Sequence, residues 1–236
     1  MLIAGFDQQP GTDNQMNDGS PLMFSRIVRD YDRMNRLMSL GMDRAWRERA
    51  AADCEGLVLD LCCGTGDMAI ASKKRGLSVI GLDGNMAMLR AARRKSPGLP
   101  LVLADAQCLP FKDSSFDSAT IAWGIRNIPE RNLALREAIR ILRPGGKLVV
   151  LDSVLPGNPF VRFLFRLYAV IWIPILARLI RADLPAYRYF VGSVERFGQK
   201  INFLGEMKAA GFERAQALDL SFGLVAMFTG NTGETP

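Results

Sequence analysis

The fold is decided by the stretch Leu57-Val58-Leu59-Asp60-Leu61-Cys62-Cys63-Gly64-Thr65-Gly66-Asp67-Met68-Ala69. Its first five residues are apolar except for one aspartate, which is typical of a short buried strand. A glycine-rich turn follows at residues 64–66, and a helical pattern begins at Met68. A strand, a turn and a helix in this order predict a βαβ unit, whose two strands lie parallel in one sheet.

The same alternation continues along the chain. Further strands are expected at residues 78–82, 101–104, 116–123, 147–152, 215–220 and 224–229. Helices are expected at residues 85–95, 130–142 and about 199–210, and a helical pattern from Met23 to Ala50 precedes the first strand. The sequence therefore predicts an α/β fold with a seven-stranded, mostly parallel sheet and helices on both faces.

One folded domain is expected over residues 23–230, because a chain of 236 residues suits a single α/β domain. Residues 1–22 are predicted to be a flexible tail, since they are polar and rich in Gly, Asn, Asp and Gln. Residues 158–181 interrupt the alternation with an apolar, arginine-flanked segment. We expect an inserted helical cap over about residues 158–195.

Histidine is absent from the chain, and 30 Lys and Arg exceed 24 Asp and Glu, giving a net charge of +6. Histidine is the usual general base near neutral pH and the commonest metal ligand. Its absence excludes Ser-His-Asp and Cys-His catalysis and HExxH zinc sites. We expect no metal, and proton transfer must use a carboxylate, Tyr, Lys, Cys or water.

Cysteine usage and the lack of a targeting pattern favour a reducing, cytoplasmic compartment. The four cysteines (Cys54, Cys62, Cys63 and Cys108) contain no CxxC pair, so a disulfide framework is not expected. The N-terminus lacks the apolar stretch of a signal peptide. The longest uncharged apolar run, Leu167–Ala177, is about half of the ~20 residues that a membrane span needs.

The turn Gly64-x-Gly66-x-x-Ala69 matches a dinucleotide-binding motif, but its neighbours favour another ligand. Asp60 and Asp67 flank the turn, and two carboxylates would repel a diphosphate. They suit a positively charged ligand without phosphate, such as S-adenosylmethionine. Asp60 is then expected to hold its amino-acid end, while the two glycines let the backbone pass close to the ligand.

Polar residues at the ends of the next strands extend this expected site. Asp83 ends the second strand, where its carboxylate can accept hydrogen bonds from both ribose hydroxyls. Asp105 and Ala106 follow the third strand and are expected beside the adenine edge. All lie at carboxyl ends of parallel strands, where open α/β sheets bind ligands.

Nucleic acid is not the expected methyl acceptor. The fourth strand runs into Gly124-Ile125-Arg126-Asn127. It carries neither the N/D-P-P-Y tetrapeptide of amino-methylases nor the Pro-Cys nucleophile of cytosine-C5 enzymes. Base-flipping chemistry is therefore poorly supported.

A set of motifs extends over the region from Phe24 to Thr229. They are Tyr31-Asp32-x-Met34-Asn35-x-x-Met38-Ser39-Leu40-Gly41 with Trp46, Asp60-x-x-x-Gly64-Thr65-Gly66-Asp67, Asp105-Ala106 with Leu109-Pro110-Phe111, Gly124-Ile125-Arg126-Asn127, Arg143-Pro144-Gly145-Gly146, and Tyr187-Arg188-Tyr189 with Ser193. Together they resemble the ubiquinone/menaquinone biosynthesis C-methyltransferases. The chain departs from that pattern at Asp43, where the family has His, at Asp152, where it has Glu, and at Ala122, where it has Ser.

The resemblance implies a Rossmann-like class I methyltransferase fold and C-methylation of a prenylated quinol, for example demethylmenaquinol to menaquinol. It implies that Arg126 and Asn127 lie beside the quinol and that Tyr187 lies at the edge of the cap. The implied S-adenosylmethionine site consists of Asp60, Gly64, Thr65, Gly66, Asp83, Asp105, Ala106 and Ala122. Two alternatives remain open: methylation of another hydrophobic small molecule, and a catalytically silent S-adenosylmethionine-binding protein that partners other enzymes.

The first part of the cap has the composition of a membrane-surface element. Phe160–Arg181 combines aromatic and aliphatic residues with four arginines and no acidic residue. We expect it to contact the inner face of the cell membrane or to cover an isoprenoid tail. The alternatives are a buried helix with exposed arginines, or a contact between two copies in a homodimer.

Overall fold

A central sheet runs through the residues that the computed structural model describes, 21–179 and 184–234. Its strands are β1 (Leu57–Leu61), β2 (Ser78–Asp83), β3 (Leu101–Leu103), β4 (Phe116–Ala122), β5 (Leu142–Ser153), β6 (Glu213–Leu220) and β7 (Val225–Asn231). They form one seven-stranded sheet in the order β3-β2-β1-β4-β5-β7-β6. The first five pair in parallel, and β7 is antiparallel to both β5 and β6. This confirms the predicted mostly parallel sheet.

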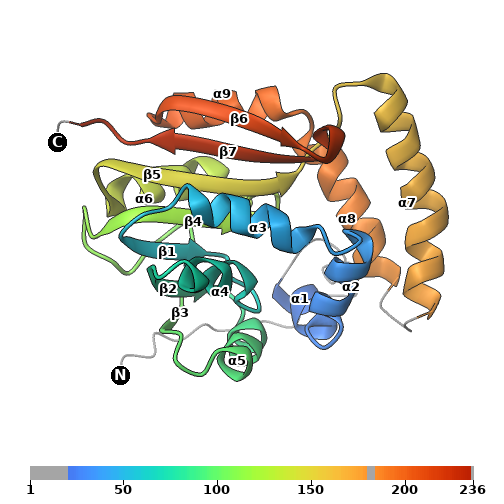
Figure 1. Ribbon diagram of the computed structural model, residues 1–236, viewed down its shortest axis with the longest axis horizontal. Helices are drawn as coiled ribbons and strands as arrows, with labels where there is room; N and C mark the ends of the chain where they lie inside the picture. Colours follow the sequence, from blue (N-terminus) through green and yellow to red (C-terminus); the bar gives the residue numbers. More distant parts are fainter. Residues whose placement is uncertain (1–20, 180–183, 235–236) are drawn as a thin grey trace.

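Helices cover both faces of this sheet (Figure 1). One face carries α3 (Asp43–Ala52) and α4 (Asp67–Lys74), and the other carries α6 (Arg131–Ile141) and α9 (Lys200–Ala210). A further helix, α5 (Met86–Lys95), packs against β2 and β3. Apolar residues of these helices and strands form a buried cluster on each face, which is why the strands are nearly continuous apolar runs.

The N-terminal helical pattern is divided into three helices. These are α1 (Pro21–Ile27), α2 (Tyr31–Met38) and α3. The second break falls at Leu40 and Gly41, whose φ angles are 51° and 80°. A left-handed backbone cannot continue a right-handed helix, so the chain turns here and α3 runs in a new direction.

The fifth strand begins earlier than expected. Residues 143–146, which separate the helix expected at 130–142 from the strand expected at 147–152, lie inside β5 as an irregular segment. The register shows the irregularity, because Phe116 pairs with Leu142 while Ser118 pairs with Lys147. Extra residues on one strand of a pair form a bulge. The proline and two glycines of this segment, which favour a turn, form the bulge here.

The cap consists of α7 (Pro159–Leu179) and α8 (Leu184–Phe197). Together with α1 and α2 they stand at the end of the sheet where β1, β4 and β5 finish (Figure 1). Tyr168 of α7 ties the cap to α2 by donating a 3.0 Å hydrogen bond to the carbonyl of Met38. Among the described residues, none of the helices combines the length and apolar character that crossing a membrane requires.

Candidate active site

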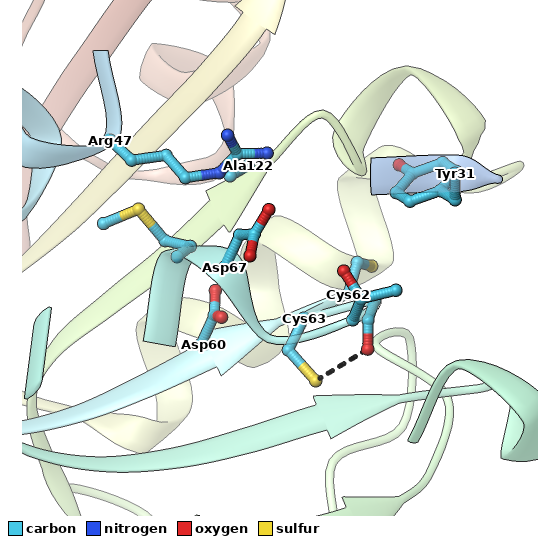
Figure 2. Close-up of a pocket in the computed structure, with 10 residues that line it drawn as sticks. Tyr31, Arg47, Asp60, Cys62, Cys63, Asp67 and Ala122 are labelled. Carbon is cyan, nitrogen blue, oxygen red and sulfur yellow. Dashed lines mark hydrogen bonds between the residues drawn. The ribbon is translucent and has the colours of Figure 1, made fainter. Parts of the chain in front are cut away.

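A small cavity that opens to solvent lies at the carboxyl ends of β1 and β4. It is lined by Tyr31, Arg47, Asp60, Cys62, Cys63, Gly64, Thr65, Asp67, Met68 and Ala122 (Figure 2). Of the residues predicted to bind the methyl donor, Asp60, Gly64, Thr65 and Ala122 line it. Gly66, Asp83, Asp105 and Ala106 do not.

The two glycines of the turn have different reasons to be glycine. Gly64 has a φ of 54°, and a Cβ on it would meet nothing within 4 Å. Its open side therefore faces space that a ligand can fill. Gly66 has a φ of 85°, and its Cβ would lie 3.3 Å from the side chain of Ala92. Gly66 thus serves the packing of the turn, and the expectation that it also makes room for the ligand is not needed to explain it.

Asp60 is a buried carboxylate at the base of the cavity, with 1% of its surface exposed. It accepts hydrogen bonds from the backbone N–H of Ala69 (3.0 Å) and the hydroxyl of Thr120 (2.8 Å). Burial raises the pKa of Asp60 to about 7, and these two hydrogen bonds oppose that rise. A positively charged group beside it would favour the ionised form.

Asp83 shapes the turn from the end of β2. Its two carboxylate oxygens accept hydrogen bonds from the backbone N–H groups of Gly64 (2.7 Å) and Asn85 (2.8 Å). Burial raises the pKa of Asp83, and the same two hydrogen bonds act in the opposite direction. Asp105, by contrast, is exposed and accepts hydrogen bonds from Gln107.

A polar network joins the turn to α2 and α5. Thr65 donates its hydroxyl to Asp32 of α2, and Lys95 at the end of α5 donates to Thr65 at 3.0 Å. Lys95 also forms ion pairs with Asp32 (2.5 Å) and with Asp67 (2.7 Å). One lysine thereby connects the N-terminal helices to the rim of the cavity.

Backbone strain is concentrated at the same strand ends. Cys62 follows β1 and Trp123 follows β4, and both have positive φ, 53° and 56°. Gly124 follows Trp123, and a Cβ on it would come within 2.5 Å of the Cβ of Cys62. Residues held in sparsely populated conformations cluster at functional sites when the surrounding structure fixes them.

Arg126 and Asn127 lie in the short 3-10 helix η2 (Ile125–Asn127), after β4 and against α8. The Arg126 side chain is 8% exposed and pairs through Nη1 with the fully buried Asp152 at 2.5 Å. Its Nε donates to Ser193 of α8 at 3.1 Å. Asn127 accepts a 2.9 Å hydrogen bond from the hydroxyl of Tyr189, also in α8. The loop and the cap are therefore joined through these two residues.

Asp152, the acidic partner of Arg126, has a raised pKa. Burial raises the pKa of Asp152, while the Arg126 guanidinium acts to lower it. Tyr187, the third predicted acceptor-side residue, belongs to α8, but its side chain lies outside the part of the chain that the structure describes.

Several cavity residues were not assigned by sequence reasoning. Tyr31 is among them; burial raises the pKa of its hydroxyl, and the charge of Arg126 opposes this. It stands in a quoted motif, so a signal for it existed. Arg47 carries no such local signal. It reaches across one side of the cavity from α3, with Asp60 and Asp67 below it in the view (Figure 2).

The lining carries two carboxylates and one guanidinium around an open glycine, a charge pattern that suits a zwitterionic, positively charged ligand. Among the described residues, no group of three or more Cys, Asp or Glu side chains is arranged to hold a metal ion. The arrangement can bind and orient a charged nucleoside, with the Arg126 loop and the cap beside it.

Residues 14–232 match the model of the ubiE/COQ5 methyltransferase family. The chain is 40% identical over 234 residues to a ubiquinone/menaquinone biosynthesis C-methyltransferase UbiE of Syntrophotalea carbinolica, covering 95% of this chain and 96% of that protein. It is 41% identical to a demethylmenaquinone methyltransferase of Thermus thermophilus, covering 89% and 99%.

Solved structures support the fold. A SAM-dependent methyltransferase of Thermotoga maritima aligns with a TM-score of 0.65 at 24% identity, covering 89% of this chain and 97% of that one. A SAM-dependent methyltransferase of Aquifex aeolicus aligns with a TM-score of 0.62 at 15% identity, covering 90% and 98%. At these identities the likeness concerns the Rossmann-like fold alone.

Proposed function

Because the chain belongs to the ubiE/COQ5 methyltransferase family, and is an S-adenosylmethionine-dependent methyltransferase, we propose that it C-methylates a prenylated quinol, most specifically demethylmenaquinol to menaquinol. The names and coverage of the two relatives above support this acceptor. The observation that carries the proposal is the position of Arg126. Its buried guanidinium joins the strand end beside the donor cavity to the cap.

We assign donor binding to the residues around the turn. The open side of Gly64 gives room for the ligand, and Asp60 meets its positively charged amino-acid end. Asp83 would accept the ribose hydroxyls, and Asp105 and Ala106 would border the adenine. Thr65, Gly66 and Ala122 complete the predicted set, the first through its contact with α2 and the second through packing.

The reaction forms a bond between an acceptor ring carbon and the methyl carbon of the donor. The bond from that methyl carbon to the sulfonium sulfur breaks, its electron pair stays on sulfur, and S-adenosylhomocysteine leaves as a neutral thioether. The ring carbon next to a phenol hydroxyl becomes nucleophilic as the phenol loses its proton, and the ring proton leaves after the methyl group has transferred. Arg126 would stabilise the phenolate, or hold the water that takes the proton, because a guanidinium is itself too weak a base. Holding both reactants in line contributes a large part of the rate, with effective molarities of about 10⁵ M or more.

A membrane-facing role for α7 fits the same acceptor, since a prenylated quinol is held in lipid. Large apolar residues are exposed along this helix: Phe160, Phe163, Leu164, Leu167, Val170, Ile171, Trp172 and Ile175. Arg166 and Arg178 are exposed on it as well. An apolar surface with arginines and an exposed tryptophan suits the boundary of an anionic bilayer. We place the protein at the inner face of the cell membrane, although a homodimer would also cover this surface.

The acceptor is tested by incubating the protein with labelled S-adenosylmethionine and reduced demethylmenaquinone, other demethylated quinols, or a lipid extract. We expect labelled menaquinol. Arg126→Ala should lower turnover at least about 100-fold and leave donor affinity within a few-fold, because it removes electrostatic stabilisation on the acceptor side only. Arg131→Ala, which removes a partly exposed ion pair with Glu206, is the control for general loss of charge.

Three outcomes would contradict the proposal. A labelled product formed only from the lipid extract, and not from quinols, would indicate another hydrophobic acceptor. Donor binding without any product would indicate a silent binding protein. Equal loss of donor affinity and turnover in Arg126→Ala would remove the acceptor-side role of this residue.

Membrane contact is tested by sedimentation with anionic and with zwitterionic vesicles. We expect the protein to sediment with the anionic ones, and Phe163→Ser with Trp172→Ser to reduce the bound fraction several-fold. Leu133→Ser, at an exposed leucine of α6 on another part of the surface, should leave binding unchanged. A shift from dimer to monomer in the α7 variants, without any change in sedimentation, would assign this surface to a homodimer.

A further inference from the structure

Arg47 is a buried arginine, and three of its five N–H donors have no hydrogen-bond partner among the described residues. The residue is 7% exposed and lines the donor cavity. Its Nη1 donates to the carboxylate of Asp43 (2.5 Å) and to the carbonyl of the same residue (3.2 Å). Its Nε is buried and has no hydrogen-bond partner among the described residues. Its Nη2 forms no hydrogen bond within the described part of the chain either, but it keeps some exposed surface. Because a buried donor without a partner is unfavourable, this edge of Arg47 is suited to an acceptor supplied by a ligand.

The unused donors lie on one edge of the guanidinium. Nε–H and the outer N–H of Nη2 point in the same direction and form the fork that binds a carboxylate through two parallel hydrogen bonds. The other edge is occupied by Asp43. The free edge of Arg47 is therefore shaped for a planar anion with two oxygens.

The orientation of Arg47 is fixed from two sides. Asp43 is 2% exposed and also accepts a 3.0 Å hydrogen bond from Ser39 and an ion pair from Arg36. The guanidinium carbon lies 4.6 Å from the centre of the Trp123 ring, which fixes the plane of the group. A side chain held in this way is preorganised for a ligand and loses little entropy when it binds one.

We propose that Arg47 binds the carboxylate of the methionine part of S-adenosylmethionine, with Asp43 as its positioning residue. The proposal rests on the methyl donor binding in this cavity. Asp60 and Asp67 line the cavity with Arg47. The two carboxylates can bind the ammonium and sulfonium groups of the ligand, and the guanidinium can bind its carboxylate.

A simpler role for Arg47 would be to balance the negative charge of Asp60 and Asp67. Its charge does act to lower the pKa of Asp60, against the larger effect of burial. The two roles predict different effects of losing Arg47 on the affinity for a donor that lacks the carboxylate. Loss of a merely balancing charge would tighten binding of any cationic ligand, whereas loss of a carboxylate partner weakens only the ligand that carries one.

The test compares S-adenosylmethionine with decarboxylated S-adenosylmethionine by titration calorimetry. The wild-type protein should bind the first more tightly, although the second carries more positive charge. In Arg47→Met the affinity for S-adenosylmethionine should fall roughly 10- to 100-fold, which is the effect of losing hydrogen bonds to a charged group. The affinity for the decarboxylated ligand should stay the same or rise. Arg47→Lys should retain part of the preference.

Further variants separate positioning from charge and folding. Asp43→Asn should reduce the preference for the carboxylate several-fold, while Arg36→Met, which removes the other arginine on Asp43, should not change it. The ratio of the two affinities within one variant is insensitive to a fraction of unfolded protein. Equal weakening for both ligands, or unchanged affinity for S-adenosylmethionine in Arg47→Met, would overturn the proposal. Failure of the wild-type protein to bind either ligand would instead remove the donor site itself.

Discussion

Asp60 is an acid whose surroundings bring its pKa close to neutral. The sheet buries it almost completely, and two hydrogen bonds to it only partly offset the loss of water. With a pKa of about 7, a fraction of the protein without ligand carries a neutral Asp60 at physiological pH. The sequence predicts this residue and its ligand class from its place at the carboxyl end of a strand, but it cannot predict the raised pKa, which depends on burial.

The raised pKa predicts that donor binding strengthens with pH. A cationic ligand favours the ionised carboxylate, so binding to a protonated site must first release a proton. We expect the affinity for S-adenosylmethionine to rise between about pH 6 and 8 and then to level off. Calorimetry in buffers of different ionisation enthalpy should show proton release below about pH 7.

The matched control is Asp60→Asn, which keeps the size of the side chain and loses its charge. This variant should bind the donor more weakly and with little pH dependence over the same range. If the rise in affinity with pH is the same in Asp60→Asn as in the wild-type protein, another group, such as Asp83, is responsible.

Arg47 and Tyr31 line the cavity, but the sequence did not identify them as site residues. The turn residues were predictable because strand, turn and helix are adjacent in the sequence. Arg47 and Tyr31 come from helices before β1, and they reach the cavity only through contacts between distant parts of the chain. The helical pattern of residues 23–50 indicates which residues are apolar, but not where the helices lie against the sheet.

The N-terminal helices form part of the cavity wall, through Tyr31 of α2 and Arg47 of α3. The interruption at Leu40 and Gly41 lets α2 bring Tyr31 to the cavity while α3 lies on the sheet (Figure 1). Lys95 joins α2 to the rim by contacting Asp32, Thr65 and Asp67 together. An ion-pair network with shared members is worth more than an isolated surface pair, and this one is partly buried.

Removing that lysine should release α2 from the cavity. In Lys95→Met we expect donor affinity to fall several-fold, because Asp32 and Asp67 then repel each other and Thr65 loses a partner. Limited proteolysis should cleave the region around α2 faster, since fewer contacts hold it. Addition of S-adenosylmethionine should slow that cleavage less in the variant than in the wild-type protein.

Arg94→Met serves as the control, because Arg94 is an exposed cation one residue away on the same helix. It should change neither donor affinity nor the cleavage rate. A similar loss of affinity in Arg94→Met would show that the overall positive charge of α5, and not the link made by Lys95, determines binding.

At the scale of the whole molecule, strand order determines where the site lies. The chain builds the sheet outward from β1 through β2 to β3, and then returns to place β4 on the other side of β1. Helices therefore leave the carboxyl ends of β1 and β4 toward opposite faces, and the space between those ends is where such sheets bind ligands. The alternation of strands and helices predicted the sheet, but the antiparallel insertion of β7 between β5 and β6 depends on long-range pairing that no local pattern records.

Gly124 lies where the ends of the two central strands, β1 and β4, approach each other closely. Its φ is −102°, so alanine is allowed conformationally, but the new Cβ would lie 2.5 Å from the Cβ of Cys62. Since Cys62 already has a φ of 53°, it cannot easily move away. We expect Gly124→Ala to lower the free energy of unfolding by about 1–3 kcal/mol and to weaken donor binding, as measured by denaturant titration and calorimetry. Gly98→Ala, where a Cβ would meet nothing within 4 Å, should have little effect.

The collision itself can be removed, which separates it from any other effect of the alanine. Cys62→Gly deletes the opposing Cβ and suits the positive φ at that position. In the double variant Cys62→Gly/Gly124→Ala, the alanine should therefore cost much less than it does alone, so that the two substitutions are strongly non-additive. Additive losses would mean that β1 and β4 adjust independently and that this contact does not set the spacing of the strand ends around the donor cavity.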